Sequence, residues 1–185
     1  MTIIKTLGPD TTDSYRAACV WANENRDKLG DFEIKGYPRM EYVFKDLAKA
    51  DLIVMPVGFT DRDNDDFSSW VDYHYYYSNK LEIAGLFPLD TMEMILVENL
   101  DYKYDRAIVQ SSTIQLLKRN GINCSNVDFS PSKSYALMLF NEMDFRYVIC
   151  SSSDYEAKRS DENKAHDRII ERTSIRMIWV VYRVK

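Results

Sequence analysis

The sequence predicts an α/β protein built as two lobes that share a ligand cleft. Segments typical of strands and of helices alternate along the 185 residues. Residues 51–57 are apolar almost without a break, which is typical of a parallel strand buried on both faces. Serine and threonine gather just after several apolar segments, where open α/β sheets bind their ligands. Hydrophobic residues make up 45% and charged residues 29% of the chain, a balance that supplies enough apolar surface for one large domain or two small lobes.

In the first half, residues 2–7 are β-branched and apolar, as a buried strand should be, and Gly8-Pro9 ends them. Thr11, Thr12 and Ser14 then precede a helix with an apolar face, and their hydroxyls can cap its N-terminus. Such an end offers free N–H groups and a partial positive charge, which suit a carboxylate or a phosphate. The rest of this half predicts strands over 31–37, 51–57, 81–86 and 92–97, a helix over 40–47, an acidic loop over 61–66 and an aromatic segment over 67–77.

The second half repeats the alternation. Residues 106–109 predict a strand, and Ser111, Ser112 and Thr113 cap a short helix that Gly121 ends. Further on, the sequence predicts an extended segment over 122–129, a helix that opens at 130–134, strands over 147–150 and 175–184, and a charged helix or loop over 158–168.

Composition excludes several classes of function. The net charge is -5 and no basic cluster interleaves with aromatics, which argues against nucleic acid and anionic membranes as partners. The three cysteines are widely spaced, which argues against a disulfide framework and a zinc knuckle. His74 and His166 lack the spacing of metal ligands, and no Gly-rich phosphate loop occurs, so we expect neither a metal nor another cofactor. Without a signal-type segment or a membrane-length apolar run, we expect a cytoplasmic protein.

The hydroxyl-bearing residues fall in sets that follow predicted strands. These are Thr11, Thr12 and Ser14; Thr60; Ser111, Ser112 and Thr113; Ser132 and Ser134; and Ser151, Ser152 and Ser153. Two interpretations remain open. The residues are ordinary helix caps, or they gather around one small carboxylate ligand. The oligomeric state also remains open, with a homodimer as one option.

The order of these segments resembles the catalytic domain of prephenate dehydratase over nearly the whole chain. Gly8-Pro9, Thr12 and Ser14 match the opening motif of that family, which has glycine where Thr11 stands. Residues 51–56 are similar to its strand ending in proline, and residues 109–117 and 132–136 to two later helix starts. The resemblance implies the two-lobed fold of type 2 periplasmic binding proteins.

The resemblance also implies a division of the chain. Residues 1–185 form one dehydratase-like domain, in which lobe one spans 1–95 and 173–185 and lobe two spans 96–172. No regulatory domain is expected after it.

Two departures from the dehydratase pattern bear on activity. The proline that ends the third strand is followed by Val57-Gly58-Phe59-Thr60, where dehydratases have an isoleucine and then Glu-Asn-Ser. The Thr-Arg-Phe triplet of the last strand corresponds to Ile175-Arg176-Met177. The arginine implied to hold a substrate carboxylate is kept, whereas the threonine implied to help the ring hydroxyl depart is lost.

These departures resemble those of the prephenate decarboxylases of the bacilysin pathway. That resemblance implies a lyase of specialised metabolism that removes the ring carboxylate of prephenate, keeps the hydroxyl and leaves the ring non-aromatic. It implies catalytic roles for Arg176, Thr12 and Ser14. The predicted substrate-binding residues are Thr11, Thr12, Ser14, Thr60, Ser111, Ser112, Thr113, Ser132, Lys133 and Arg176.

Two alternatives stay open. A true prephenate dehydratase would make phenylpyruvate with Thr173 or Ser174 as the group that assists departure of the hydroxyl. A non-catalytic binder of a small carboxylated metabolite is the other, because this fold supports both kinds of function.

Overall fold

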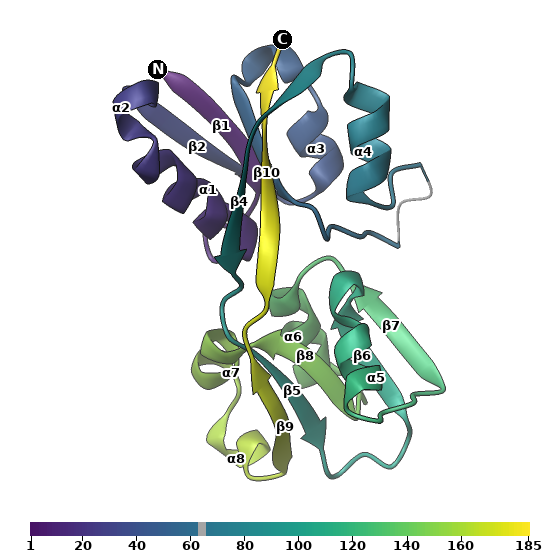
Figure 1. Cartoon of the computed structure of the whole chain (residues 1–185). Coiled ribbons are helices and arrows are strands. Elements are labelled where there is room, and N and C mark those ends of the chain that lie inside the picture. The colour runs from purple at the N-terminus through teal and green to yellow at the C-terminus, as the bar shows by residue number, and fades with distance from the viewer. Residues whose placement is uncertain (63–65) are drawn as a thin grey trace. The chain divides into compact units, whose positions relative to one another are not determined.

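A computed structural model describes residues 1–62 and 66–185 of the chain. The chain divides into two compact units, each with its own sheet and helices (Figure 1). Unit 1 comprises Met1–Thr60, residues 66–90 and Arg176–Lys185, and unit 2 comprises Thr91–Ile175 with Asp61 and Arg62. The predicted two-lobed α/β class is therefore confirmed. Among the described residues, no helix combines the length and the apolar composition that crossing a bilayer requires.

The sheet of unit 1 has the strand order β2-β1-β3-β10-β4. β1 (Thr2–Leu7) is parallel to β2 (Phe32–Tyr37) and β3 (Leu52–Pro56). β10 (Arg176–Val184) runs antiparallel between β3 and β4 (Leu81–Asp90). The helices of this unit are α1 (Asp13–Glu24), α2 (Arg26–Leu29), α3 (Met40–Phe44), the 3-10 helix η1 (Leu47–Lys49) and α4 (Trp70–Tyr77).

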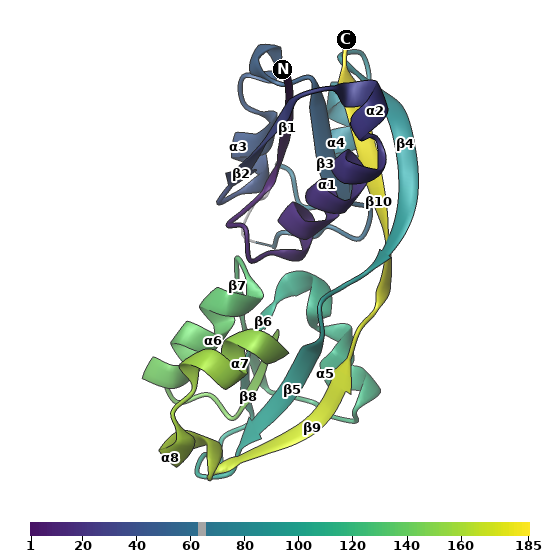
Figure 2. The same ribbon diagram turned by 90° about the vertical axis from the view of Figure 1, so that its left-hand side faces the viewer.

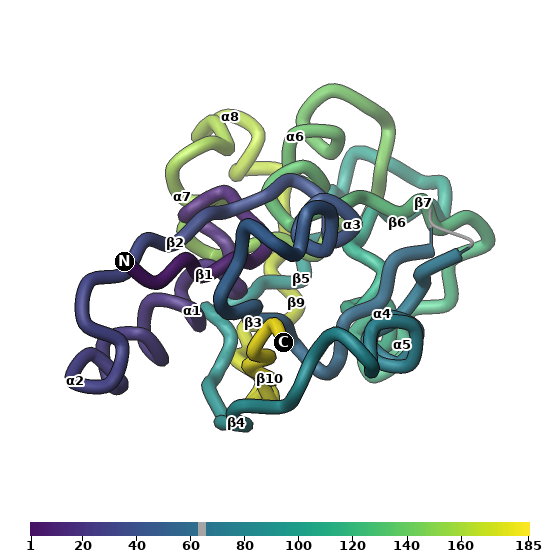
Figure 3. The backbone as a smooth tube through the Cα atoms, turned by 90° about the horizontal axis from the view of Figure 1, so that it is seen from above, coloured from purple at the N-terminus to yellow at the C-terminus, as the bar shows by residue number. Residues whose placement is uncertain are grey.

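β3 is apolar throughout because helices cover both faces of its sheet. Leu52 and Val54 pack with the small side chains of α1, such as Ala18. Ile53 and Met55 point to the other face and pack with residues of α3 and α4. Figure 3 shows α1 and α4 on opposite sides of β3 and β10. Burial on both faces is therefore what the unbroken apolar run encodes.

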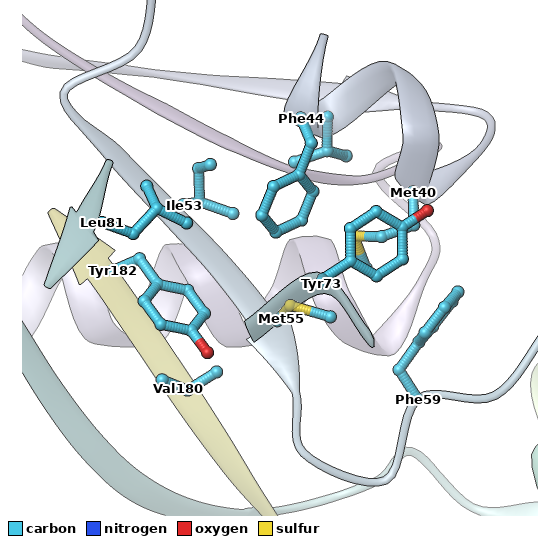
Figure 4. Close-up of a cluster of buried hydrophobic side chains, with 10 residues drawn as sticks. Met40, Phe44, Ile53, Met55, Phe59, Tyr73, Leu81, Val180 and Tyr182 are labelled. Atoms are coloured by element: carbon cyan, nitrogen blue, oxygen red, sulfur yellow. The ribbon is translucent and has the colours of Figure 1, made fainter. Parts of the chain in front are cut away.

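Aromatic rings dominate the cluster on the α3 and α4 face of unit 1 (Figure 4). The ring of Tyr73 stacks on Phe44 with 4.5 Å between centroids, and Phe59 meets it edge-on at 5.9 Å. Such pairs add to the free energy gained from burial alone. Most of the aromatic segment predicted over 67–77 is thus helix α4, and Phe59 is a core residue of unit 1, only 7% exposed.

The sheet of unit 2 has the order β7-β6-β8-β5-β9, again with helices on both faces. Its strands are β5 (Met94–Asn99), β6 (Arg106–Gln110), β7 (Asn126–Ser130), β8 (Tyr147–Ser151) and β9 (Asp167–Thr173). Its helices are the 3-10 helix η2 (Ser111–Thr113), α5 (Gln115–Arg119), α6 (Lys133–Glu142), α7 (Ser152–Lys158) and α8 (Asp161–Lys164). β6 is parallel to β7 and β8, whereas β5 is antiparallel to β8 and β9.

A buried ion pair links the end of α7 to β9 in unit 2. The Arg159 guanidinium donates from Nε and Nη2 to the two carboxylate oxygens of Asp167, at 2.8 Å each. The Tyr155 hydroxyl donates to the same carboxylate at 2.9 Å, and Asn141 accepts a further bond from Arg159. Both charged side chains are almost fully buried. The network holds two helices, α6 and α7, and the strand β9 together.

β9 is the strand that the sequence interpretation missed. Asp167, Arg168, Glu171 and Arg172 make this segment look like a solvated helix or loop, but it forms an edge of the sheet beside β5. β4 is also longer than expected, reaching Asp90 instead of ending at Leu86. The acidic loop predicted over 61–66 lies partly outside the described residues. Figure 2 shows β4 continuing into β5, and β9 into β10, through short connections. The chain leaves unit 1 after Asp90 and re-enters it after Ile175. The sequence analysis predicted these two crossings near residues 95 and 172.

Candidate functional site

The carboxyl ends of the parallel strands in unit 1 meet at one edge of its sheet. β1 ends at Leu7 and β3 at Pro56, and the antiparallel β10 begins at the same edge with Arg176. The turn after β1 leads into α1, and the segment after β3 leads to Thr60. Five predicted site residues of unit 1 therefore lie on segments that leave or enter this edge: Thr11, Thr12, Ser14, Thr60 and Arg176.

Thr12 is the N-cap of α1. Its Oγ1 accepts from the N–H of Tyr15 at 3.3 Å and lies 2.8 Å from the carbonyl oxygen of Pro9 and 3.1 Å from that of Leu7. The hydroxyl hydrogen is thus directed at the turn that precedes the helix. The capping interpretation is confirmed for Thr12, and a direct role in ligand binding stays a prediction.

The other hydroxyls at this edge differ in exposure. Thr11 is exposed, whereas Ser14, in the first turn of α1, is 6% exposed. Thr60 is half-buried and forms a bridge with Ser69, just before α4. Thr11 is therefore the hydroxyl of the opening stretch that solvent and solutes reach most easily.

Arg176 is 71% exposed and lies directly opposite Asp90 on the neighbouring strand. Its Nε is 3.1 Å from Asp90 Oδ1. A second arginine, Arg16 of α1, donates from Nη1 to the backbone carbonyl of Asp90 at 2.8 Å. The sequence interpretation missed Arg16 and Asp90, because only the strand register and the reach of α1 bring them together.

Ile175 lies in the connection between β9 and β10, where the sequence placed the missing threonine. Its side chain packs at the rim of the core beneath α5. Its N–H donates to Oγ1 of Thr91 at 3.0 Å, and its carbonyl accepts from the N–H of Thr91 at 2.9 Å. A threonine hydroxyl is therefore present beside Ile175, supplied by the neighbouring connection. Thr91 was not predicted, since it stands 84 residues away in the sequence.

The carboxyl ends of β6, β7 and β8 likewise meet at one edge of the sheet in unit 2. Hydroxyl groups crowd this edge, because each of these strands ends in or is followed by serine or threonine. They belong to Ser111, Ser112, Thr113, Ser130, Ser132, Ser134, Ser151, Ser152 and Ser153. The sets predicted for the second half thus lie on one edge.

Most of these hydroxyls bond within their own segment. Ser112 donates to the side-chain oxygen of Gln110 at 2.5 Å, and Thr113 donates to its backbone carbonyl at 2.8 Å. Ser132 caps α6 by accepting from the N–H of Tyr135 at 3.1 Å. Ser111 is 7% exposed. Capping and turn formation are therefore established roles in unit 2 as well.

Lys133 is the first residue of α6, next to a charged group that the sequence did not flag. The hydroxyl of Ser134 donates to the carboxylate of Asp154 in α7, which also pairs with Lys158 at 2.5 Å. Burial raises the pKa of Asp154, but the bonds from Lys158 and Ser134 outweigh burial and lower it. Asp154 is thus a carboxylate that joins the first turns of α6 and α7.

Each of the two histidines has a polar side chain beside its Nδ1. His74 Nδ1 lies 2.9 Å from the hydroxyl of Tyr182, to which Trp70 Nε1 also donates at 2.9 Å. His166 Nδ1 lies 3.1 Å from Asp101 in unit 2. Over the described ranges, no three His, Cys, Asp or Glu side chains are grouped so that they could hold a metal ion.

At the level of sequence, the chain matches no protein-family model and no curated protein. Solved structures do share its fold. A prephenate dehydratase from Arthrobacter aurescens, in complex with L-Phe, is 11% identical with a TM-score of 0.57; the match covers 100% of this chain and 61% of that one. The prephenate dehydratase of Staphylococcus aureus is 15% identical with a TM-score of 0.53, covering 99% and 66% of the two chains.

Domains of another kind share the fold equally well. The periplasmic VFT2 domain of Bordetella pertussis BvgS is 15% identical with a TM-score of 0.57, and the match covers 98% of this chain and 80% of that one. For both dehydratases, by contrast, the chain spans less than two thirds of their length. At such low identity the likeness establishes architecture alone. The chain has the two-lobed α/β fold that prephenate dehydratases and VFT domains share.

Proposed function

We propose that this chain is a lyase that acts on prephenate and removes its ring carboxylate without expelling the ring hydroxyl. The proposal rests on one observation above all. At the start of β10, Arg176 presents an exposed guanidinium, whereas the side chain of its neighbour Ile175 is apolar and packs at the rim of the core of unit 2. Arg176 is a cation that can bind a carboxylate. Ile175, the residue before it, carries no acidic group that could protonate the ring hydroxyl of prephenate as it leaves.

The proposed step is balanced by one proton. The bond between the ring and its carboxylate breaks and carbon dioxide leaves. The electron pair passes into the ring diene, and a ring carbon takes up a proton while the hydroxyl stays. This step needs positioning and stabilisation of the developing charge more than it needs a general acid at the hydroxyl. Expulsion of the hydroxyl would require such an acid.

The remaining site residues are assigned as part of the same proposal. Thr11 and Ser14, at the start of α1, accompany the Thr12 cap as ligands for one carboxylate, which the N-terminus of this 12-residue helix favours. Thr60 follows β3 at the same edge. At the corresponding edge of unit 2, the residues that the sequence predicts to bind substrate are Ser111, Ser112, Thr113, Ser132 and Lys133, and their role stays a prediction.

A dehydratase is the first alternative, and Thr91 gives it a specific basis. Its Oγ1 accepts the N–H of Ile175, so its hydrogen can be donated elsewhere. It joins Thr173 and Ser174 as a group that could assist departure of the ring hydroxyl. If the purified protein forms phenylpyruvate, replacing Thr91 by valine should abolish that product.

A non-catalytic binder of a carboxylated metabolite is the second alternative. It is favoured by the likeness to the BvgS VFT2 domain, which matches four fifths of that domain's length. A binder would use Arg176 at the same edge of the unit 1 sheet to hold a carboxylate, and it would need no proton transfer.

One assay separates the three functions. Purified protein is incubated with prephenate, and the ring protons and released carbon dioxide are followed by NMR and by trapping. A non-aromatic keto acid with one carboxylate fewer supports the decarboxylase, phenylpyruvate supports the dehydratase, and unchanged prephenate that binds supports the binder. Arg176→Gln should lose affinity, while Arg183→Gln is the matched control, because Arg183 pairs with Glu82 across the same two strands at their far end.

A further inference from the structure

Arg16 is the second exposed cation attached to Asp90. It lies in α1 and reaches across to the end of β4, where it bonds the backbone carbonyl of Asp90. Arg176 bonds the side chain of the same residue. Within residues 1–62 and 66–185, neither guanidinium makes any other hydrogen bond or ion pair. Most of the N–H groups of both arginines therefore remain available to an anion.

The two guanidinium groups approach Asp90 from different faces of the sheet. Met177 of β10 packs with the α1 cluster, so its neighbour Arg176 lies on the face of α3 and α4. Arg16 comes from α1 itself. A single carboxylate cannot easily be shared by both groups, whereas two separate anionic groups of one ligand can each take one. The two arginines and Asp90 carry a net charge of one positive unit, which favours such a ligand.

We propose that Arg16 and Arg176 form a two-arginine site for a ligand with two carboxylates, and that Asp90 is the positioning residue of this site. The inference rests on the proposed function, since it gives the second carboxylate of prephenate a partner. Asp90 acts on the two arginines differently. Its side chain accepts from Arg176 Nε and leaves both Nη nitrogens available, while its backbone carbonyl accepts from Arg16 whatever the side chain is.

Calorimetric titration tests the inference with two pairs of probes. Prephenate, with two carboxylates, is compared with phenylpyruvate, which has one, and glutarate is compared with valerate. Arg16→Gln should raise Kd roughly tenfold for the dicarboxylates, because it removes a charged hydrogen-bond donor from an exposed site, and change it less than twofold for the monocarboxylates. Arg183→Gln should change neither, since it removes an equally exposed cross-strand arginine.

Asp90 provides the second test. Asp90→Ala should raise Kd and KM severalfold with kcat unchanged, and Asp90→Asn should restore both, because the amide oxygen can still accept from Arg176 Nε. If Arg16→Gln lowers the melting temperature and leaves the affinity for dicarboxylates unchanged, the inference is overturned. Arg16 would then only stabilise the fold by joining α1 to the end of β4. Tighter binding in both Asp90 variants would overturn the positioning role.

These outcomes are distinguishable from failure of the proposed function. If glutarate binds in an Arg16-dependent way but prephenate neither binds nor reacts, the two-arginine site stands and the prephenate assignment fails. If prephenate is converted and Arg16→Gln behaves as the unmodified protein does, the assignment stands and the two-arginine site fails.

Discussion

At the scale of single residues, Thr12 separates a stability role from a binding role. Replacing it with valine keeps the shape but removes the oxygen that accepts from Tyr15 and donates to the preceding turn. We expect Thr12→Val to lower the free energy of unfolding by about 1 kcal/mol, the usual loss for a removed N-cap. Thermal melting checks this, with Thr11→Val as the exposed control. An unchanged melting temperature together with a weaker Kd for prephenate would instead make Thr12 a ligand contact.

Ile175 tests whether the chemistry is limited by a missing hydroxyl. Ile175→Thr places a hydroxyl beside the Thr91 bond, and a positioned acid contributes roughly 10²–10⁴-fold to a proton-transfer step. We expect a trace of phenylpyruvate, because the polar residues that dehydratases carry after the third strand are absent and Phe59 is buried in the core. Ile175→Val is the control of similar shape. Equal amounts of phenylpyruvate from the two variants would mean that the hydroxyl is not what the site lacks.

Tyr182 makes the stability of unit 1 sensitive to alkaline pH. Burial raises the pKa of Tyr182 to about 12, although the bond donated by Trp70 opposes this shift. The unfolded chain releases this proton near its ordinary pKa, about 10, so above that pH the native state holds more protons and stability falls as pH rises. We expect Tyr182→Phe to flatten this fall in a urea denaturation series between pH 9 and 11. At neutral pH it should cost about 1–3 kcal/mol, since Trp70 Nε1–H loses its acceptor. A slope identical to that of the unmodified protein would contradict the assignment.

At the scale of elements, the end of β1 fits its neighbour only because two glycines meet there. A Cβ on Gly8 would lie 2.8 Å from Cα and 2.9 Å from the carbonyl carbon of Gly36 in β2, and neither backbone atom can swing aside. We therefore expect Gly8→Ala to cost about 1–3 kcal/mol of stability by forcing apart β2 and the turn before α1. Gly85→Ala is the matched control, because its Cβ would meet nothing closer than Trp21 Nε1 at 3.6 Å. Equal melting temperatures for the two variants would show that the turn absorbs the methyl group.

Elements with a strong hydrophobic pattern could be predicted from the sequence, whereas the edge strand β9 could not. β3 was recognised because burial on both faces leaves no polar position in it. β9 was missed because an edge strand tolerates the charged residues that also mark a solvated helix. Phe59 belongs to a segment that departs from the dehydratase pattern and bears on activity, but its side chain turns into the core beside Tyr73. The direction of a side chain after a strand end depends on tertiary packing, which local pattern does not carry.

The candidate site was predictable only where a motif is local. The opening stretch carried its hydroxyls within four residues, and the cap at Thr12 followed from propensity alone. Asp90, Arg16 and Thr91 act through partners 74 to 86 residues away. Such pairs become visible only once strand register is known.

At the scale of the whole molecule, each unit has its own hydrophobic core. We therefore expect a substitution that destabilises one unit to change the unfolding of that unit more than the unfolding of the other. Arg159→Ala leaves the carboxylate of Asp167 buried without its partner, which should cost unit 2 about 3–5 kcal/mol. All three tryptophans, Trp21, Trp70 and Trp179, belong to unit 1. We expect the far-ultraviolet circular dichroism transition of this variant to move to lower urea than its tryptophan fluorescence transition.

Arg119→Ala is the control for that experiment, since its ion pair with Glu171 is half exposed and such pairs contribute little. Coincident transitions in Arg159→Ala would show that the two units unfold as one cooperative body.

The place of β10 in the sheet of unit 1 sets an order for folding during synthesis. β10 lies between β3 and β4, yet it follows the whole of Thr91–Ile175 in the chain. A ribosome therefore delivers every strand of unit 2 before the strand that joins β3 to β4 in unit 1. Until then β3 and β4 each wait with an unpaired edge, the kind of surface on which nascent chains aggregate. Unit 2 can finish folding first, and unit 1, which holds the two arginines, keeps unpaired strand edges until its last strand has been made.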